Sequence, residues 1–202
     1  METPKTADVI ICGAGMAGIS TAYFLSNKEG VQNVLLIDKR YPLTLTSDKS
    51  AECYRNWWPD STMIQFMNRS IDLMEELSRA SDNIFNLNRR GYCYITLDGR
   101  RISRFKNIAQ KRARLGLGPV RLHIANSNVS PYIPSTSEEF EKAPKGIDLI
   151  LDQDVIQKNY SYLSNHVKAI IHARRCGFLR NCKKITCDSY AIQTQPEAGL
   201  MV

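Results

Sequence analysis

The 202-residue sequence lacks several features that identify a protein class at first sight. No stretch reaches the roughly 18 consecutive apolar residues of a membrane-spanning helix, so we expect no membrane span. The first residues include Glu2 and Asp8 in place of the basic start of a signal peptide. The six cysteines form no CxxC pair, which favours reduced thiols and makes the cytoplasm the expected location.

Histidine is also scarce, with only three in the chain. The closest metal-ligand grouping, Cys176, Cys182 and Cys187 with His172, has spacing too loose for a tetrahedral zinc site. We therefore expect no bound metal, and we assign no histidine to catalysis because a lone histidine is usually structural.

The whole chain has a net charge of +7, and acidic residues are nearly absent from one of its segments. Between Arg89 and Arg121 there are ten basic residues and a single acid, Asp98. Phe105 is one of few aromatic side chains there that could stack on bases, so we expect no nucleic-acid binding. A solvated face, or an electropositive rim that attracts carboxylate substrates, explains the charge better.

The first forty residues predict a strand, a helix and a second strand. Residues 7–12 form a short β-branched run typical of a buried parallel strand. Small and apolar residues recur at helical spacing over residues 16–26, and residues 33–38 form a second apolar run that ends at Asp38. Together they predict a βαβ unit and an α/β fold.

Between the first strand and the helix lies a GxGxxG motif, Gly13 to Gly18. Gly13 permits the tight turn, Gly15 lets a pyrophosphate approach the backbone, and Gly18 lets the helix pack closely on the strand. The helix N-terminus offers free N–H groups to the phosphates. Asp38, twenty residues after Gly18, is placed to accept hydrogen bonds from the ribose hydroxyls and disfavours NADP. The pattern predicts dinucleotide binding; a purely structural turn is the alternative.

Further along the chain the pattern predicts a loop, several helices and several strands. Residues 41–52 form a Ser- and Thr-rich loop that we expect to lie against a ligand, with a helix opening near Ser50. We expect a helix over residues 61–81 capped by Asp60 or Ser61, a β-hairpin that turns at Asp98-Gly99 into residues 101–105, and a short basic helix over residues 107–115. Strands are expected at residues 147–152 and 166–172, with a helical turn at residues 154–162 between them.

Six segments, taken together, resemble a known family. ADVIICGAGMAGISTAYFLS, LLIDKR, LTSDKSAECYRNWWP and RRGYCYITLDG are similar to the N-terminal part of FAD-dependent oxidoreductases of the D-amino-acid oxidase type, which includes sarcosine and glycine oxidases. GIDLILDQDVIQKNYSYL and HARRCGFL are similar to the connection between that family's two domains. The resemblance implies a Rossmann-like, three-layer FAD-binding fold with part of a second, mixed-sheet substrate domain.

The resemblance also implies roles for individual residues. Gly13, Gly15, Gly18, Asp38 and Arg40 would hold the ADP part of FAD, and Thr46, Ser47 and Ser50 would approach the pyrophosphate and the ribityl chain. Within the same segments, the candidate cofactor-binding residues also include Ala14, Met16, Ala17 and Lys39. The loop after Asp38 contains no histidine, so a covalent flavin link is not expected there.

Trp57 and Trp58 follow this loop, and they either wall a flat ring or pack in the core.

The reaction implied is oxidation of a C–N bond of a small amine or amino acid by hydride transfer to the flavin, with no catalytic residue assigned. Family members are roughly twice this length, which implies a truncated chain. We expect part of the FAD-binding domain in residues 1–90, the start of the substrate domain in residues 91–180 and an atypical tail in residues 181–202. Alternatives are a non-catalytic chain that binds a partner chain or itself, and an NAD-linked dehydrogenase.

Overall fold

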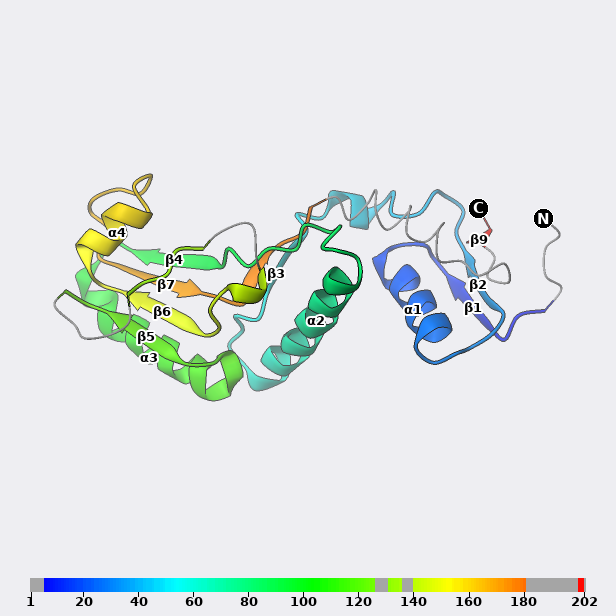
Figure 1. Ribbon diagram of the computed structural model, residues 1–202, viewed down its shortest axis with the longest axis horizontal. Helices are drawn as coiled ribbons and strands as arrows, with labels where there is room; N and C mark the ends of the chain where they lie inside the picture. The colour runs from blue at the N-terminus through cyan, green and yellow to red at the C-terminus, as the bar shows by residue number, and fades with distance from the viewer. Residues whose placement is uncertain (1–5, 126–130, 136–139, 181–199, 202) are drawn as a thin grey trace. The chain divides into compact units, whose positions relative to one another are not determined.

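The computed structural model describes residues 6–125, 131–135, 140–180 and 200–201 (Figure 1). The chain divides into two compact units: an N-terminal unit of residues 1–51 with 181–202, and a central unit of residues 52–180. The boundary expected after residue 90 falls inside the central unit, because residues 52–90 pack there. Most of the expected tail, residues 181–199 and 202, lies outside the described residues.

The N-terminal unit contains the predicted βαβ arrangement. Strand β1 (Val9–Cys12) precedes helix α1 (Met16–Asn27), and β2 (Val34–Ile37) pairs with β1 in parallel. A two-residue strand, β9 (Leu200–Met201), pairs in parallel with the other edge of β2. The buried side chains Ala14, Ile19, Leu36 and Leu43 form the core of this unit. The sequence expectation of an α/β fold that opens with βαβ is therefore confirmed.

The central unit is built around a four-stranded mixed sheet with the order β4-β7-β6-β5 (Figure 1). Its strands are β4 (Tyr92–Thr96), β5 (Val120–His123), β6 (Ile147–Ile150) and β7 (Ala169–Ala173); only the β5–β6 pairing is parallel. Strands β3 (Cys53–Arg55) and β8 (Cys176–Phe178) form a separate antiparallel pair. The helices are α2 (Ser61–Ala80), α3 (Ile102–Arg112) and α4 (Gln153–Asn159), with shorter helical turns at η2 (Gly99–Arg101), η3 (Ala113–Leu117) and η4 (Phe140–Lys142).

The predicted hairpin at Asp98-Gly99 is wrong. The side chain of Asp98 accepts a hydrogen bond from the backbone N–H of Arg100 at 3.0 Å, so it caps a helical turn that leads directly into α3. Residues 107–115 are helical as expected, but α3 begins earlier, at Ile102, and η3 follows it from Ala113. Strand β4 pairs instead with β7, from a distant part of the chain. The cap at Asp60 is confirmed, because its carboxylate accepts from the N–H of Met63 at 2.8 Å.

The two faces of the four-stranded sheet differ in chemistry. One face carries apolar residues such as Leu149 and Ile171, which pack with residues of α2 and α3 in the main core. The opposite face carries a polar row, because Cys93, His172 and Asp148 are register partners on β4, β7 and β6. Within the described residues, no helix is long and apolar enough to cross a membrane.

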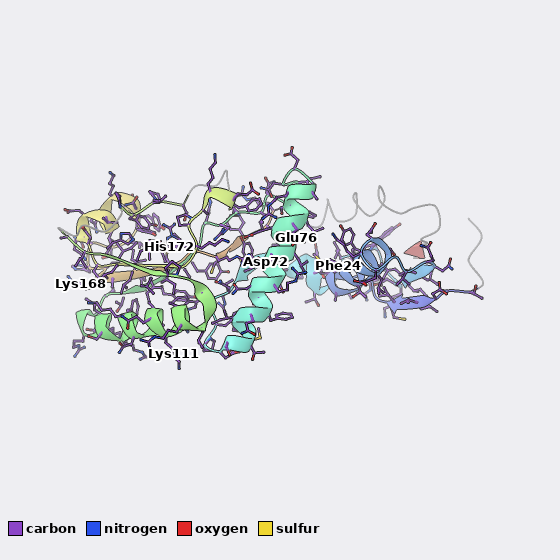
Figure 2. All side chains as sticks on the ribbon, turned by 60° about the horizontal axis from the view of Figure 1, so that its bottom comes forward. Phe24, Asp72, Glu76, Lys111, Lys168 and His172 are labelled. Carbon is purple, nitrogen blue, oxygen red and sulfur yellow. The ribbon has the colours of Figure 1, made fainter. Side chains whose placement is uncertain are left out.

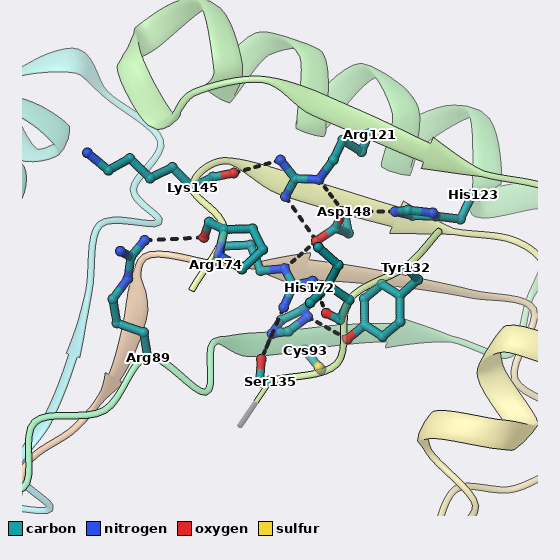
Figure 3. Close-up of polar contacts among 12 residues, drawn as sticks. Arg89, Cys93, Arg121, His123, Tyr132, Ser135, Lys145, Asp148, His172 and Arg174 are labelled. Carbon is teal, nitrogen blue, oxygen red and sulfur yellow. Dashed lines mark hydrogen bonds and ion pairs between the residues drawn. The ribbon is translucent and has the colours of Figure 1, made fainter. Parts of the chain in front are cut away.

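Asp148 lies at the centre of a buried ion cluster (Figure 3). Arg121 donates to Oδ1 of Asp148 at 2.6 Å and to Oδ2 at 3.0 Å. Nε2 of His123 lies 2.8 Å from Oδ1, and Arg174 donates to Oδ2. Burial opposes ionisation of Asp148, but the hydrogen bonds and charges of these three residues outweigh it and lower its pKa to about 2. The carboxylate therefore stays ionised and ties three strand regions together.

His172 lies within the same sheet, whereas Lys111 projects from α3 into solvent (Figure 2). The Nε2 atom of His172 lies 2.8 Å from the carbonyl oxygen of Arg90, which can only accept, so Nε2 carries the proton. Nδ1 then accepts from the hydroxyl of Tyr132 at 2.9 Å. Burial, together with the positive charge of Arg174, lowers the pKa of His172 to about 4. The imidazole is neutral at neutral pH.

We predict that Asp148→Asn destabilises the protein by about 3–5 kcal/mol, because it leaves buried cations without their counter-charge. Urea unfolding followed by circular dichroism measures this change. Asp82→Asn makes the same acid-to-amide change at an exposed residue, and it should cost less than about 0.5 kcal/mol. Equal effects of the two substitutions would contradict the role assigned to Asp148.

We also predict a pH dependence of stability from His172. Its folded pKa lies below the ordinary value of 6.5, so its contribution to stability is present above pH 6.5 and is lost as the pH falls toward 4. The free energy of unfolding should fall by roughly 2–4 kcal/mol over this interval from this group. Urea titrations at several pH values should show that the free energy of unfolding depends less on pH in His172→Gln than in the wild type. His166→Gln replaces an exposed imidazole and should leave this pH dependence unchanged.

Candidate functional site

The candidate site begins at the turn between β1 and α1. The backbone of Gly13 has φ +108°, which favours glycine, and its N–H donates to the carbonyl of Ile37 at 2.7 Å. Gly15 is the N-cap of α1 and, as a glycine, has no side chain of its own to cap the helix. The first turn of α1 contains no acidic residue. The N–H groups of the first helical turn have no acceptor within the helix, so this end of α1 favours an anion.

Gly18 sets the distance between helix and turn. A Cβ atom at this position would lie 1.8 Å from the carbonyl oxygen of Gly13, so any larger residue forces the helix away from the strand. The positions of Gly13 and Gly15 are open by comparison. A Cβ on Gly13 would meet nothing within 4 Å, and one on Gly15 would lie 3.5 Å from Oγ of Ser47. Gly18 therefore lets α1 pack closely on the turn, whereas Gly13 and Gly15 leave open space at the turn.

Asp38 lies at the end of β2 and turns its carboxylate toward the glycine turn. One oxygen accepts from the N–H of Ala14 at 2.7 Å, and the other accepts from the N–H of Arg40 at 2.9 Å. The hydrogen bond from Ala14, followed by that from Arg40, lowers the pKa of Asp38 below its usual value. The carboxylate is ionised and fixed in orientation, and each oxygen keeps a lone pair for a further donor.

Ser47 is the member of the hydroxyl-rich loop that reaches the helix end. Its Oγ accepts from the N–H of Met16 at 3.1 Å, across 31 residues of sequence. Because the oxygen acts as acceptor there, the hydroxyl hydrogen is available to a second group. Among the predicted site residues, the structure thus brings the glycine turn, Asp38 and Ser47 together.

The other predicted residues are near in sequence but more exposed. Ala17, Lys39, Arg40, Thr46 and Ser50 all have exposed side chains. The helix expected to open near Ser50 is not present; a short 3-10 helix, η1 (Thr46–Lys49), ends there instead. With Ser50 at the C-terminal end of that helix, its N–H cannot serve as a helix N-terminal donor.

Sequence reasoning missed the contribution of Leu43. This residue is buried, has φ +60°, and donates its N–H to the carbonyl of Ala14 at 2.9 Å. It folds the loop back onto the glycine turn and packs in the same core as Ile19 and Leu36. The signal available in the sequence was a large apolar residue within a Pro- and Thr-rich loop.

The tryptophan pair divides between two environments. Trp57 is buried in the main core, stacks on Tyr94 with ring centroids 5.1 Å apart, and lies beneath the guanidinium of Arg112 at 4.3 Å. Trp58 is half-buried and lies 4.8 Å from the guanidinium of Arg55. Of the two alternatives expected for this pair, a wall for a flat ring or packing in the core, Trp57 follows the second.

We predict that Gly18→Ala destabilises the N-terminal unit by about 1–3 kcal/mol, because the new methyl group must displace the backbone of Gly13. Hydrogen exchange of the amides in β1 and α1 measures the loss locally. Gly99→Ala is the matched control, since its Cβ would meet nothing within 4 Å and its backbone is not left-handed. Unchanged exchange in Gly18→Ala would show that the close approach is absent.

Comparison with known proteins agrees with this geometry. Sarcosine oxidase subunit beta from Arthrobacter sp is 30% identical over 92 residues, which are 45% of this chain and 22% of that protein. Glycine oxidase from Bacillus cereus has a TM-score of 0.65 and 16% identity, covering 96% of this chain and 47% of its own. L-proline dehydrogenase from P. horikoshii has a TM-score of 0.68 and 17% identity, covering 98% of this chain and 44% of its own. The chain thus spans less than half the length of these proteins. A model of the DAO family, described as FAD dependent oxidoreductase, matches residues 8–157, and the chain therefore belongs to this family.

Proposed function

We propose that the N-terminal unit binds the ADP part of FAD and that this chain contributes the nucleotide-binding part of an amine or amino-acid oxidoreductase. The observation that carries the proposal is the convergence of the open glycine turn, the N-terminus of α1 and the ionised Asp38. These residues fit an adenine dinucleotide because they offer N–H donors to phosphate and a carboxylate acceptor to ribose.

The pyrophosphate is assigned to the turn at residues 13–18. The open positions at Gly13 and Gly15 leave room for phosphate oxygens to reach the backbone, and the dipole of α1 favours their negative charge. Ser47 supports this assignment, because its oxygen accepts from the N–H of Met16 and its hydroxyl hydrogen can still donate to a second group. Lys39, Arg40, Thr46 and Ser50 remain proposed contacts of the same cofactor.

The ribose is assigned to Asp38. Its two oxygens each receive one backbone N–H, and the remaining lone pairs match the two neighbouring hydroxyl groups of the sugar. A ribose that carries a 2′-phosphate would bring a second negative charge to this carboxylate and would be repelled. FAD, which has free hydroxyls, meets the requirement.

The reaction is proposed from the family. When bound, the flavin accepts a hydride from a C–N bond of the substrate. The relatives named above are oxidases or dehydrogenases of glycine, sarcosine and proline, so we propose a small amine or amino acid as substrate. No described residue is assigned a catalytic role. We propose that turnover needs regions equivalent to those of the relatives that this chain does not match.

Calorimetric titration of the full chain with FAD, ADP and FMN tests the nucleotide assignment. Because the contacts assigned to the glycine turn and to Asp38 are to the ADP part, FAD and ADP should bind with similar affinity and FMN should bind much more weakly than either. Asp38→Ala should weaken both by roughly tenfold or more, since it removes hydrogen bonds to a charged group. Glu29→Ala removes the same charge at an exposed residue of the same unit and should change neither affinity.

Two results would contradict the proposal. A folded chain that binds neither FAD nor ADP would remove the nucleotide function. If Asp38→Ala binds as tightly as the Glu29→Ala control, the ribose assignment is wrong. NAD⁺ also carries the ADP part, so only an affinity for NAD⁺ well above those for FAD and ADP would favour the NAD-linked alternative.

A further inference from the structure

The central unit contains a small polar cavity that the proposed function does not use. Its volume is about 140 Å³. This is below the roughly 300 Å³ at which pockets for drug-sized ligands begin, so the cavity suits an ion or a small molecule. It is lined by Asn83, Asn86, Asn88, Arg90, Phe178 and Arg180. These residues come from the segment between α2 and β4 and from the end of β8.

The walls of this cavity are held by hydrogen bonds. The side chain of Asn88 donates to the carbonyl of Phe178 at 2.7 Å and accepts from the N–H of Arg90 at 3.3 Å. The side chain of Asn83 accepts from the N–H of Leu87 at 2.8 Å and donates to its carbonyl at 3.2 Å. These hydrogen bonds fix the side chains of Asn83 and Asn88 before any ligand binds.

Two guanidinium groups face the aromatic ring in this cavity. The Cζ atoms of Arg180 and Arg90 lie 5.5 and 5.9 Å from the ring centroid of Phe178, within the range of a cation–π contact. Within the part of the chain that the structure describes, neither forms an ion pair with a carboxylate. By contrast, the neighbouring Arg89 is buried and lies 3.9 Å from Glu75. Arg90 and Arg180 thus bring two uncompensated positive charges to one small cavity.

The side-chain amide of Asn88, a buried residue of the lining, also has a hydrogen-bond donor to spare. Asn88 is 5% exposed, and its amide has two N–H groups, of which one donates to Phe178. Across the described residues, the second N–H has no hydrogen-bond acceptor. Guanidinium groups also only donate. A ligand that accepts hydrogen bonds and carries negative charge therefore complements the cavity.

We propose that this cavity, the Arg90–Arg180 pocket, binds the carboxylate group of a small organic acid. Arginine binds carboxylates through paired, charge-assisted hydrogen bonds. Phe178 adds an apolar wall on which the carbon skeleton of such an acid packs, and inorganic phosphate has no group that uses it. The pocket belongs to the central unit, so this proposal does not depend on nucleotide binding by the N-terminal unit.

The test is an NMR titration of the ¹⁵N-labelled full chain with sodium succinate, sodium phosphate and sodium chloride. Succinate should produce saturable shifts of the Nε–H signals of Arg90 and Arg180, and chloride should not. The double variant Arg90→Gln/Arg180→Gln should weaken succinate binding at least about tenfold, because both charged donors are lost. Arg90→Lys/Arg180→Lys should also bind more weakly than the wild type, since lysine keeps the charge but not the paired geometry.

Arg104→Gln/Lys106→Gln is the matched control, because it removes two positive charges from exposed positions on α3. It should bind succinate as the wild type does, and circular dichroism should show that all variants are folded. Three outcomes would overturn the proposal: no saturable shift with succinate, equal weakening in the control, or phosphate binding as tight as succinate binding. The last would show that the pocket binds oxyanions in general without using its apolar wall.

Discussion

The N-terminal unit depends on the close approach of α1 to the turn that follows β1. At Gly18 the helix comes so near the carbonyl of Gly13 that no side chain fits between them. This approach holds the helix N-terminus at the end of the strand, next to the carboxylate at the end of β2. Without it, the N–H groups of the turn and the oxygens of Asp38 would not lie close enough together to meet the one ligand that we propose. A packing constraint on one residue therefore creates the electrostatic character of the site.

The central unit uses charged residues in the opposite way. Asp148 receives hydrogen bonds from Arg121 and Arg174 and contacts His123, all within a buried face of the sheet. These bonds consume its capacity to bind anything else, so the cluster is a structural one despite its resemblance to an active site. The neutral His172 belongs to the same layer, since its ring nitrogens are occupied by Tyr132 and the backbone of Arg90.

Local pattern was enough to predict the βαβ start, the glycine turn and α2. In each case the signal lies within one segment: β-branched runs, glycines at fixed spacing, and a cap such as Asp60. The hairpin at Asp98-Gly99 was wrong because the same dipeptide also caps a helix, and the choice depended on apolar residues that follow it. The ion cluster at Asp148 could not be predicted, because Asp148 lies on β6 and its partners come from β5 and from the end of β7, whose pairing the sequence does not state. For the same reason, the sequence did not predict the contact between Ser47 and Met16; the family resemblance placed Ser47 near the pyrophosphate only.

Unused hydrogen-bonding capacity distinguishes the proposed nucleotide site from the structural polar cluster at Asp148. Asp38 is fixed by two backbone N–H groups, yet each of its oxygens keeps a lone pair, and Ser47 keeps its hydroxyl hydrogen. Because these side chains are already held in place, binding costs less conformational entropy. The free lone pairs of Asp38 and the hydroxyl hydrogen of Ser47 are left for specific contacts. Asp148 is equally fixed but has no comparable surplus. Burial and charge alone would have favoured Asp148, whereas counting free donors and acceptors favours Asp38, the carboxylate we propose as the binding group.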